Sequence, residues 1–571
     1  MGQAHQLTGP SPWDLSCPDW EQRLRDGRSL VPDLPLDRAR ADQAVGIFKK
    51  LRIPDVPGTP TLGDAAGQWI LDIVAAMFGA YDVATATRMI RGLFLLTPKK
   101  SAKTTYGGAI MLVAMVLNRR PLAELLLTAP SHEISDKAFS QVAGMIALDD
   151  EGYLQKRFHA RDHIKTIECR KTKAKLKIKT FDASIVTGAV PAAALIDEVH
   201  LLGGDAQAEA IIAQLVGGMV SVPEAFWGMI TTQSFRPPQG IFKSELQVAR
   251  GIRDGRIRNV DTLSVLYEFS EAQQKDETFW KDPAHWPLIT PNLNRSVWLP
   301  TLIKDFDKAV HKGADALAIW ASQHLNIEIG LGLHSGGWAG APFWERRGDP
   351  KLTLEELLRR SEIVTVGVDG GGLDDLLGLG VIGRDRETKA WLHWGKAWAH
   401  RSVLERRKDI AAKLLDLEKA GDLTIPERLG DDVDEVVSIV CDIYERKLLP
   451  EKGAIGVDPV GIDAITTALD VEGIRGDAIV GVSQGWRLSG TIKSVERRLA
   501  EGSFLHGAQP LMAWAVGNAK IVANGNALNI TKAVSGSAKI DPLMALFDAA
   551  ALMAQNPQPE QKALHQLIII G

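Results

Sequence analysis

The feature that most limits what this chain can fold into is a series of short apolar runs separated by segments with helical spacing. The runs are GLFLL at 92–96, ELLLTA at 124–129, AAALID at 192–197 and AFWGMITT at 225–232. Strands that are apolar on both sides are typical of parallel sheets, because helices cover both faces of such a sheet. The alternation therefore predicts an α/β architecture with a parallel sheet in the first half of the chain.

The chain has 571 residues, which is too many for a single hydrophobic core. The formal net charge of −4 excludes a chain that is basic throughout, so any contact with nucleic acid would have to come from local basic patches. We expect four segments: an N-terminal extension at 1–60, a first α/β domain at 61–335, a Gly/Pro/Trp-rich linker at 336–360 and a second domain at 361–571.

Cysteine usage and the length of the apolar runs indicate the compartment. The three cysteines, Cys17, Cys169 and Cys441, lie far apart and have no CxxC spacing. This argues against a zinc site or a disulfide framework and fits a reducing cytosol. The longest apolar runs, such as AIMLVAMVL at 109–117, are about half as long as a membrane-crossing helix. We expect a soluble intracellular protein that does not act in a membrane.

The segment PKKSAKT at 98–104 follows the first apolar run and precedes a long apolar helical pattern. In phosphate-binding loops of the form G-x-x-x-x-G-K-[ST], backbone N–H groups wrap the phosphates, the lysine reaches the outer ones and the hydroxyl holds Mg²⁺. Aligned on Lys103, the two glycine positions hold Thr97 and Ala102. The segment is either a glycine-poor phosphate loop or a basic turn ahead of a buried helix. In the first case, ATP would contact Lys100, Ser101, Ala102, Lys103, Thr104 and Thr105.

Two adjacent carboxylates, Asp197 and Glu198, stand at the end of the third apolar run. Open α/β sheets bind ligands at that edge, and nucleotide hydrolysis needs one carboxylate near Mg²⁺ and a second group that orients water. We expect Thr104 and Asp197 to hold Mg²⁺ and Glu198 to position the water. Thr231 and Thr232 end the fourth run. They either sense the γ-phosphate and couple its loss to motion, or reflect only the β-propensity of threonine.

Four lysines alternate in RKTKAKLKIKT: Lys173, Lys175, Lys177 and Lys179. On a strand, alternate side chains share one face. The pattern predicts either a solvated face of a hairpin or a strand that contacts the phosphates of DNA.

The second half has a different organisation. Residues 362–385 read as two apolar runs around a Gly-rich turn, and 389–400 alternates like a third strand. Asp369, Asp458 and Asp541 each stand at the end of an apolar element. Each is either a turn or cap residue, or one of three acids that converge to hold two Mg²⁺ or Mn²⁺ ions for in-line attack on a phosphodiester. Three strands, an acid-bearing strand and a terminal helix follow the element order of a ribonuclease-H-like nuclease domain.

With both halves in this order, the chain resembles the large subunit of tailed-bacteriophage terminases, the motor and nuclease that packages DNA. The resemblance runs from about residue 16 to 555 and is closest to the branch with P-R-K-N-G-K-[ST] loops, represented here by PKKSAKT. It implies a P-loop NTPase domain, a parallel sheet with flanking helices, followed by a ribonuclease-H-like domain.

The resemblance also assigns roles to single residues. Gln68 stands where the family places an adenine-reading glutamine, Asp197 and Glu198 resemble its Walker B strand end, and Thr231-Thr232 resembles its coupling motif. His506, in an H-x-x-x-P-x-x-x-W-x-x-x-N run, lies near the nuclease metals or is a buried structural histidine.

The function that the resemblance implies is ATP-driven translocation of double-stranded DNA into a procapsid, with metal-dependent endonucleolytic cutting of concatemers. The implied cofactors are ATP with Mg²⁺ and two divalent cations in the nuclease site. The implied partners are double-stranded DNA, the terminase small subunit, the portal protein and further copies in a pentameric ring, in the host cell cytoplasm. Two alternatives are a DExH-type helicase-nuclease of DNA repair or recombination, and a DNA-binding structural protein without activity.

Overall fold

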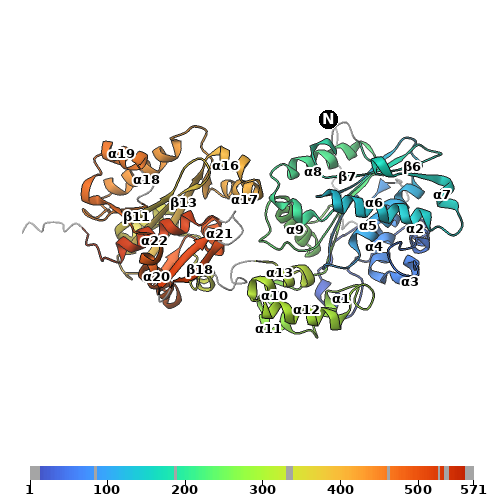
Figure 1. The fold of residues 1–571 in the computed structure, drawn as a ribbon, viewed down its shortest axis with the longest axis horizontal. Coiled ribbons are helices and arrows are strands. Elements are labelled where there is room, and N and C mark those ends of the chain that lie inside the picture. Colours follow the sequence, from blue (N-terminus) through green and yellow to red (C-terminus); the bar gives the residue numbers. More distant parts are fainter. Residues whose placement is uncertain are drawn as a thin grey trace, which may run out of the picture. The chain divides into compact units, whose positions relative to one another are not determined.

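The structure is a computed structural model that describes residues 13–82, 87–185, 190–329, 338–458, 463–524, 527–532 and 539–559. The chain divides into two compact units, Met1–Ile329 and Gly330–Gly571, each built around its own sheet (Figure 1). No described helix is both long and apolar enough to cross a membrane.

The first unit is built on an eight-stranded sheet with the order β10-β3-β9-β8-β4-β7-β6-β5. Its strands are β3 (Gly92–Leu96), β4 (Glu124–Ala129), β5 (Phe158–Arg161), β6 (Thr166–Cys169), β7 (Lys175–Thr180), β8 (Ala193–Asp197), β9 (Phe226–Thr231) and β10 (Thr262–Leu266). All neighbours from β10 to β7 pair in parallel, whereas β6 is antiparallel to both β7 and β5. The four apolar runs form β3, β4, β8 and β9, which confirms the predicted parallel α/β sheet.

Helices surround this sheet, and a short two-stranded ladder of β1 (Tyr81–Asp82) and β2 (Thr87–Arg88) lies outside it. The helices are α1 (Trp20–Arg25), α2 (Arg38–Lys50), α3 (Leu62–Ala65), α4 (Gln68–Gly79), α5 (Lys103–Leu117), α6 (His132–Ala147), α7 (Tyr153–Arg157), α8 (Ala208–Gly218), α9 (Gly240–Arg253), α10 (Glu271–Lys275), α11 (Glu277–Lys281), α12 (Leu299–His311) and α13 (Ala314–Leu325).

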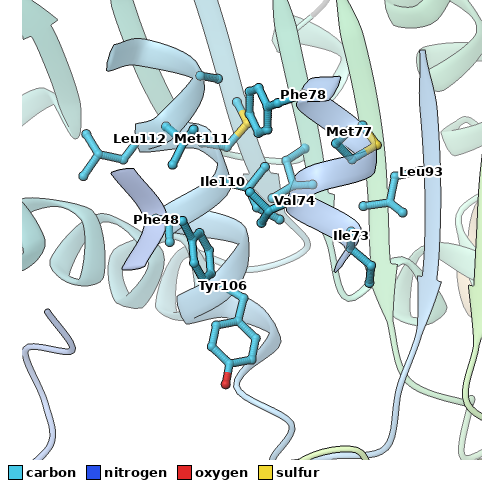
Figure 2. Packing of buried hydrophobic residues seen from close by; sticks show 14 of the residues in the cluster. Phe48, Ile73, Val74, Met77, Phe78, Leu93, Tyr106, Ile110, Met111 and Leu112 are labelled. Carbon is cyan, nitrogen blue, oxygen red and sulfur yellow. The ribbon is translucent and has the colours of Figure 1, made fainter. Parts of the chain in front are cut away.

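The helix after the PKKSAKT segment, α5, is buried along most of its length. Its side chains Ile110 and Leu112 lie in one core with Val74 of α4 and Phe48 of α2 (Figure 2). A helix that is apolar on nearly every side must be enclosed by other elements. The packing fixes the N-terminus of α5 at the edge where the parallel strands end.

The described part of the N-terminal segment, residues 13–60, packs into this unit. Trp20 of α1 and Phe48 of α2 are buried in the core that contains α4 and α5.

The second unit has a sheet with the order β14-β13-β12-β11-β15-β16, and β17 pairs with β13. β11, β12 and β13 form an antiparallel meander, whereas β11, β15 and β16 are parallel. The strands are β11 (Ser361–Gly370), β12 (Leu376–Asp385), β13 (Trp391–Ala399), β14 (Leu423–Thr424), β15 (Ile455–Val457), β16 (Ile479–Gly481) and β17 (Phe504–His506), with a separate hairpin of β18 (Ala519–Asn524) and β19 (Ala527–Lys532).

The helices of this unit are α14 (Ala341–Trp344), α15 (Leu354–Arg360), α16 (Arg401–Arg406), α17 (Lys408–Lys419), α18 (Asp431–Glu445), α19 (Asp463–Val471), α20 (Ser489–Glu501), α21 (Pro510–Asn518) and α22 (Asp541–Met553). The last helix, α22, lies directly on β11 and β12. A Cβ on Gly367 would lie 2.0 Å from the Ala545 carbonyl oxygen, and one on Gly380 would lie 2.8 Å from the Ala545 carbonyl carbon. Glycine at these two positions therefore lets the helix backbone reach the sheet.

Candidate nucleotide and nuclease sites

The loop between β3 and α5 has the backbone shape of a phosphate loop without its glycines. Ala102 caps α5 in the left-handed region with φ 57° and ψ 27°, and Lys100 has φ 71°. Thr97, at the other glycine position of the motif, has no positive φ. Of the two glycine positions, only Ala102 therefore carries the backbone cost that glycine would avoid, which is about 1–2 kcal/mol for an L-residue.

Lys103 begins α5, and its side chain folds back over the loop. It is 6% exposed, and its ammonium donates to the carbonyl oxygens of Thr97 at 3.5 Å and Pro98 at 3.4 Å. The hydroxyls of Thr97 and Ser101 are buried and make no hydrogen bond within the described residues. Buried donors without partners are costly, and an anion seated in the loop would satisfy them. The loop therefore fits a nucleotide phosphate.

Thr104 and Asp197 come into direct contact across the start of α5 and the end of β8. The Thr104 hydroxyl donates to Asp197 Oδ2 at 2.6 Å, and the Glu198 backbone N–H donates to Asp197 Oδ1 at 2.9 Å. Burial and the charge of Glu198 raise the pKa of Asp197 to about 7, although Thr104 and Lys103 oppose the shift. A hydroxyl and a buried carboxylate are ligands that suit Mg²⁺.

Glu198 sits in the left-handed region with φ 53°, directly after the strand. Its carboxylate lies 3.2 Å from Nδ1 of His200. Burial raises the pKa of Glu198, but the charge of Lys103 and the nearby His200 outweigh it and lower the pKa overall. The surroundings thus shift the two neighbouring carboxylates in opposite directions: the pKa of Asp197 is raised and that of Glu198 is lowered.

The ends of β9 and β3 are connected to this pair. The Thr231 hydroxyl contacts His200 twice, accepting from its backbone N–H at 3.0 Å and lying 3.1 Å from its Nδ1. The Thr231 carbonyl accepts from the backbone N–H of Thr97 at 3.1 Å. His200 therefore joins Glu198 to Thr231, a role that the sequence analysis did not assign to it.

Thr232 connects to the end of α13 instead. Its hydroxyl donates to the side-chain oxygen of Asn326 at 3.1 Å, and the backbone N–H of Lys99 donates to the Gln323 carbonyl at 2.7 Å. Asn326 has φ 51°, a conformation that asparagine tolerates, but an asparagine at a helix end does not by itself indicate a contact with Thr232.

Gln68 is the first residue of α4 and is exposed, and its amide donates to Asp72 at 2.7 Å. Contact with the loop comes instead through a neighbouring chain of hydrogen bonds. Asn292 accepts from the Trp69 indole at 2.9 Å and donates to Ser296 at 3.0 Å, and Ser296 donates to the Lys100 carbonyl at 2.6 Å. Gln68 therefore lies beside this chain but is not a member of it.

The alternating lysines divide into three kinds. Lys175 and Lys179 are exposed on β7, whereas Lys177 is ion-paired with Glu124 of the adjacent β4. Lys173 precedes the strand in a turn with φ 57°, so it does not share the face of the other three as the strict alternation predicted. The reason is that β6 and β7 form a tight hairpin whose turn contains Lys173.

In the second unit, the strand ends of β11 and β15 bring two acids side by side. The strands are parallel with Val368 opposite Val457, and the backbone N–H of Asp458 donates to the Val368 carbonyl at 3.3 Å. Asp369 and Asp458 therefore leave neighbouring strands at the same edge of the sheet.

The third predicted acid lies over the same edge. Asp541 begins α22, and a Cβ on Gly378, the β12 partner of Asp369, would lie 2.8 Å from the Asp541 carbonyl. A Cβ on Gly370 would lie 3.2 Å from the Asp541 Cβ. The close approach of α22 thus places Asp541 beside Asp369.

A fourth acid, Asp548, lies two turns further along α22 and is 0% exposed. The Gln484 amide donates to its Oδ1 at 3.0 Å, and its buried Oδ2 has no partner among the described residues. Burial and the charges of Asp369 and Asp458 raise the pKa of Asp548 to about 9, although Gln484 opposes the shift. The sequence pattern favoured Asp541 over Asp548, because a lone Asp within a helix carries no motif.

The described residues contain no group of three or more His, Cys, Asp or Glu side chains already arranged to hold a metal ion. The donor set nevertheless fits divalent cations, because it is made of carboxylate oxygens held at one sheet edge. Burial and like-charge repulsion together raise the pKa of Asp548, and a cation would relieve the repulsion.

His506 lies away from these acids. It pairs in register with His393 on β13, whereas Asp369 lies opposite Gly378 and hence level with Ala397. His506 and Asp369 are therefore separated by about 13 Å along the strands and about 14 Å across them. The ring of His506 stacks on Trp344 and contacts the Trp344 carbonyl at 2.7 Å, so it is a buried structural histidine.

Comparison with known proteins gives one family and several distant relatives. Residues 264–556, just over half of the chain, match the family model of the terminase large subunit, endonuclease domain. Protein YmfN of Escherichia coli (strain K12) is 22% identical over 346 residues, which cover 58% of this chain and 70% of that protein. The crystal structure of the HK97 bacteriophage large terminase has a TM-score of 0.46 and 18% identity, and covers 90% of this chain and 99% of that one. The large terminase of a thermophilic bacteriophage in complex with ADP has a TM-score of 0.29 and 13% identity, and covers 81% of this chain and 93% of that one.

Proposed function

This chain belongs to the terminase large subunit family, the motors and nucleases that package viral DNA, and we propose how its own residues carry out the two reactions. The observation that carries the proposal for the motor is the contact between Thr104 and Asp197 at 2.6 Å, with Glu198 held next to it. This contact joins a lysine–threonine loop to a paired carboxylate at one edge of a parallel sheet, where α/β proteins bind ligands.

We propose that ATP binds with its phosphates in the loop from Lys100 to Thr105. Lys103 would exchange the carbonyls of Thr97 and Pro98 for phosphate oxygens, and the buried Ser101 hydroxyl would donate to the same ligand. Gln68 would face the adenine, and Thr104 with Asp197 would hold the Mg²⁺ that neutralises phosphate charge. The ion supplies charge stabilisation in phosphoryl transfer.

Glu198 would orient the attacking water. Its pKa is lowered, so it accepts a hydrogen bond from water as a carboxylate, and His200 holds it in place. Thr231 contacts the same histidine, and Thr232 contacts Asn326. Loss of the γ-phosphate would therefore change the contacts at the end of β9 and at the end of α13. This is the coupling role proposed for the two threonines.

For the nuclease, we propose that Asp369, Asp458 and Asp541 hold two divalent cations, Mg²⁺ or Mn²⁺. The two ions would supply charge stabilisation for the attacking and leaving oxygens of a phosphodiester. Asp548 is a second candidate for the helix-borne acid, because the charges of Asp369 and Asp458 both act on it.

The wider setting follows from the family. Double-stranded DNA is the proposed substrate of both reactions, with Lys173, Lys175, Lys177 and Lys179 proposed as part of its path. The proposed partners are the terminase small subunit, the portal protein of the procapsid and other copies in a pentameric ring, in the host cell cytoplasm.

One experiment tests both halves together. The purified full chain is assayed for ATP hydrolysis with and without duplex DNA, and for cutting of plasmid DNA with Mg²⁺. The proposal requires both activities, and it requires that Lys103→Ala removes hydrolysis while Asp458→Ala removes cutting only. A chain that binds DNA but shows neither activity would instead be a structural DNA-binding protein.

A further inference from the structure

A cavity of about 580 Å³ opens in the first unit at the sheet edge opposite the nucleotide loop. It is lined by the start of β4, β8 and β9 at Leu125, Ala193 and Phe226, and by the end of α5 at Leu117. These strands are parallel and end at the nucleotide loop, so their first residues lie at the far edge of the sheet. The volume is within the range of ligand-binding pockets.

The cavity is strongly basic. Among the described residues its lining contains one carboxylate, Glu224, against five guanidinium groups: Arg40, Arg88, Arg119, Arg120 and Arg157. Glu224 is paired with Arg120 at 2.7 Å, and Arg40 is paired with Asp37 at 3.1 Å. Among the described residues, the other three arginines have no carboxylate partner within salt-bridge distance.

Two of these arginines are held in place by backbone carbonyls. Arg88 is 7% exposed and donates to the carbonyls of Met77 and Glu224, the latter at 3.0 Å. Arg157 donates to the Val116 carbonyl at 2.6 Å, which is at the end of α5. A buried guanidinium without an anion is costly, and burial accordingly lowers the pKa of Arg88. The positive charge is thus built into the fold rather than carried by loose side chains.

We propose that this cavity binds a phosphate group at a second anion site, separate from the nucleotide loop. The guanidinium fork matches phosphate oxygens in pairs, which a single lysine ammonium does not do. α5 has 15 residues, so the two sites are separated by about 22 Å along one helix. The phosphate would come either from a free phosphate compound or from the backbone of DNA.

Inorganic pyrophosphate is a suitable probe, added by calorimetric titration to the full chain with ADP present in excess to occupy the nucleotide loop. We expect saturable binding that weakens as salt rises. Arg119→Gln should weaken binding at least tenfold, because this exposed arginine contributes its charge to the cavity without supporting the fold around it. Glu224→Gln should tighten binding, since it removes this carboxylate from the lining. Arg258→Gln, an exposed arginine outside the cavity, is the matched control and should change nothing.

Opposite effects of Arg119→Gln and Glu224→Gln cannot arise from unfolding, because loss of structure would weaken binding in both variants. A 20-base-pair duplex added as competitor then identifies the source of the phosphate. Displacement of pyrophosphate points to the DNA backbone, and its retention points to a free phosphate compound. The proposal is overturned if pyrophosphate does not bind, or if both variants bind it as the unmodified chain does.

Discussion

Glu198 and Thr231 are joined by a single histidine ring, whose Nδ1 lies 3.2 Å from the glutamate carboxylate and 3.1 Å from the threonine hydroxyl. The two residues belong to neighbouring strand ends, β8 and β9, which pair in parallel. The group proposed to orient water and the group proposed to report the γ-phosphate therefore share one support. We expect a change at either end to reach the other through His200.

Glu198→Gln should keep ATP binding and lower hydrolysis by about 10²-fold or more, because the amide cannot act as the base that positions water. His200→Ala should give a smaller loss, since it removes the support of Glu198 rather than the carboxylate itself. Turnover is measured under steady-state conditions and nucleotide affinity by ADP titration. Hydrolysis by Glu198→Gln near the unmodified rate would reject Glu198 as the water-positioning residue.

Substitutions at two adjacent residues of the phosphate loop should have different effects, one on nucleotide binding and the other on stability. Lys103→Ala should weaken nucleotide binding, because its ammonium is the cation that the structure buries in the loop. Ala102→Gly should keep binding and raise the free energy of unfolding by up to about 1 kcal/mol, since glycine adopts φ 57° without a steric cost. ADP titration and thermal unfolding test both changes.

Lys137→Ala on α6, an exposed lysine outside the loop, is the control for Lys103→Ala. Unchanged ADP affinity in Lys103→Ala would indicate that the segment is a basic turn ahead of a buried helix and not a phosphate loop.

The exposed pair Lys175 and Lys179 tests whether β7 contacts DNA. Replacing both by Gln should weaken duplex binding for every sequence and reduce the salt dependence by about one slope unit per lost phosphate contact. Lys177 is left in place because it is already paired with Glu124. Lys308→Gln with Lys312→Gln, two exposed lysines at the end of α12, is the control. An identical salt slope in the β7 variant would leave the strand as a solvated face.

Two buried histidines should make the folded second unit less stable in acid. Burial lowers the pKa of His506 to about 4 and that of His393 well below its usual value, so both are neutral in the folded chain at pH 6. The unfolded chain binds protons below about pH 6.5, hence stability is full above that pH and falls toward pH 4. As the pH falls through this range, each histidine lowers the free energy of unfolding by up to about 1.4 kcal/mol per pH unit.

The measurement compares urea unfolding of the unmodified chain and of His393→Phe at pH 7 and pH 4.5. The variant should lose less stability between the two values, because one of the two slopes is gone. Parallel behaviour of the two proteins would show that His393 is not neutral and buried as the structure has it. Every other titrating group is present in both chains, so the difference between their pH dependences reports on His393 and on its interaction with His506.

The sequence predicted the elements whose signal is local. The apolar runs that became β3, β4, β8 and β9 were visible because each is buried on both sides. The acids Asp369 and Asp458 were visible because each ends an apolar strand. What the sequence could not predict depends on contacts between distant segments. No local pattern indicates that Asn326 lies beneath Thr232, or that the ring of His200 lies between Glu198 and Thr231. Asp548 comes near the strand acids because glycines let α22 lie on the sheet.

For the helix-borne acid of the nuclease, α22 offers two carboxylates, Asp541 and Asp548. If Asp369, Asp458 and Asp541 share two ions, then Asn at any one of them should abolish metal-dependent cutting and leave ATP hydrolysis intact. Asp541 lies over Gly378, the partner of Asp369, whereas Asp548 is buried and influenced by both strand acids. Either one completes a set of three, and their variants distinguish the two arrangements.

The assay is plasmid cutting by the Asn variants in Mg²⁺ and in Mn²⁺, with EDTA as the blank. Asp463→Asn, an exposed acid at the start of α19, is the matched control and should cut normally. Asp375→Asn is a second comparison. Asp375 is ion-paired with the buried Lys539, so an effect of this variant on cutting would be indirect. Robust cutting by Asp458→Asn would remove the paired strand acids from the mechanism. Cutting that survives Asp541→Asn but not Asp548→Asn would move the third ligand two turns along α22, provided that thermal unfolding shows the buried Asp548→Asn variant to be folded.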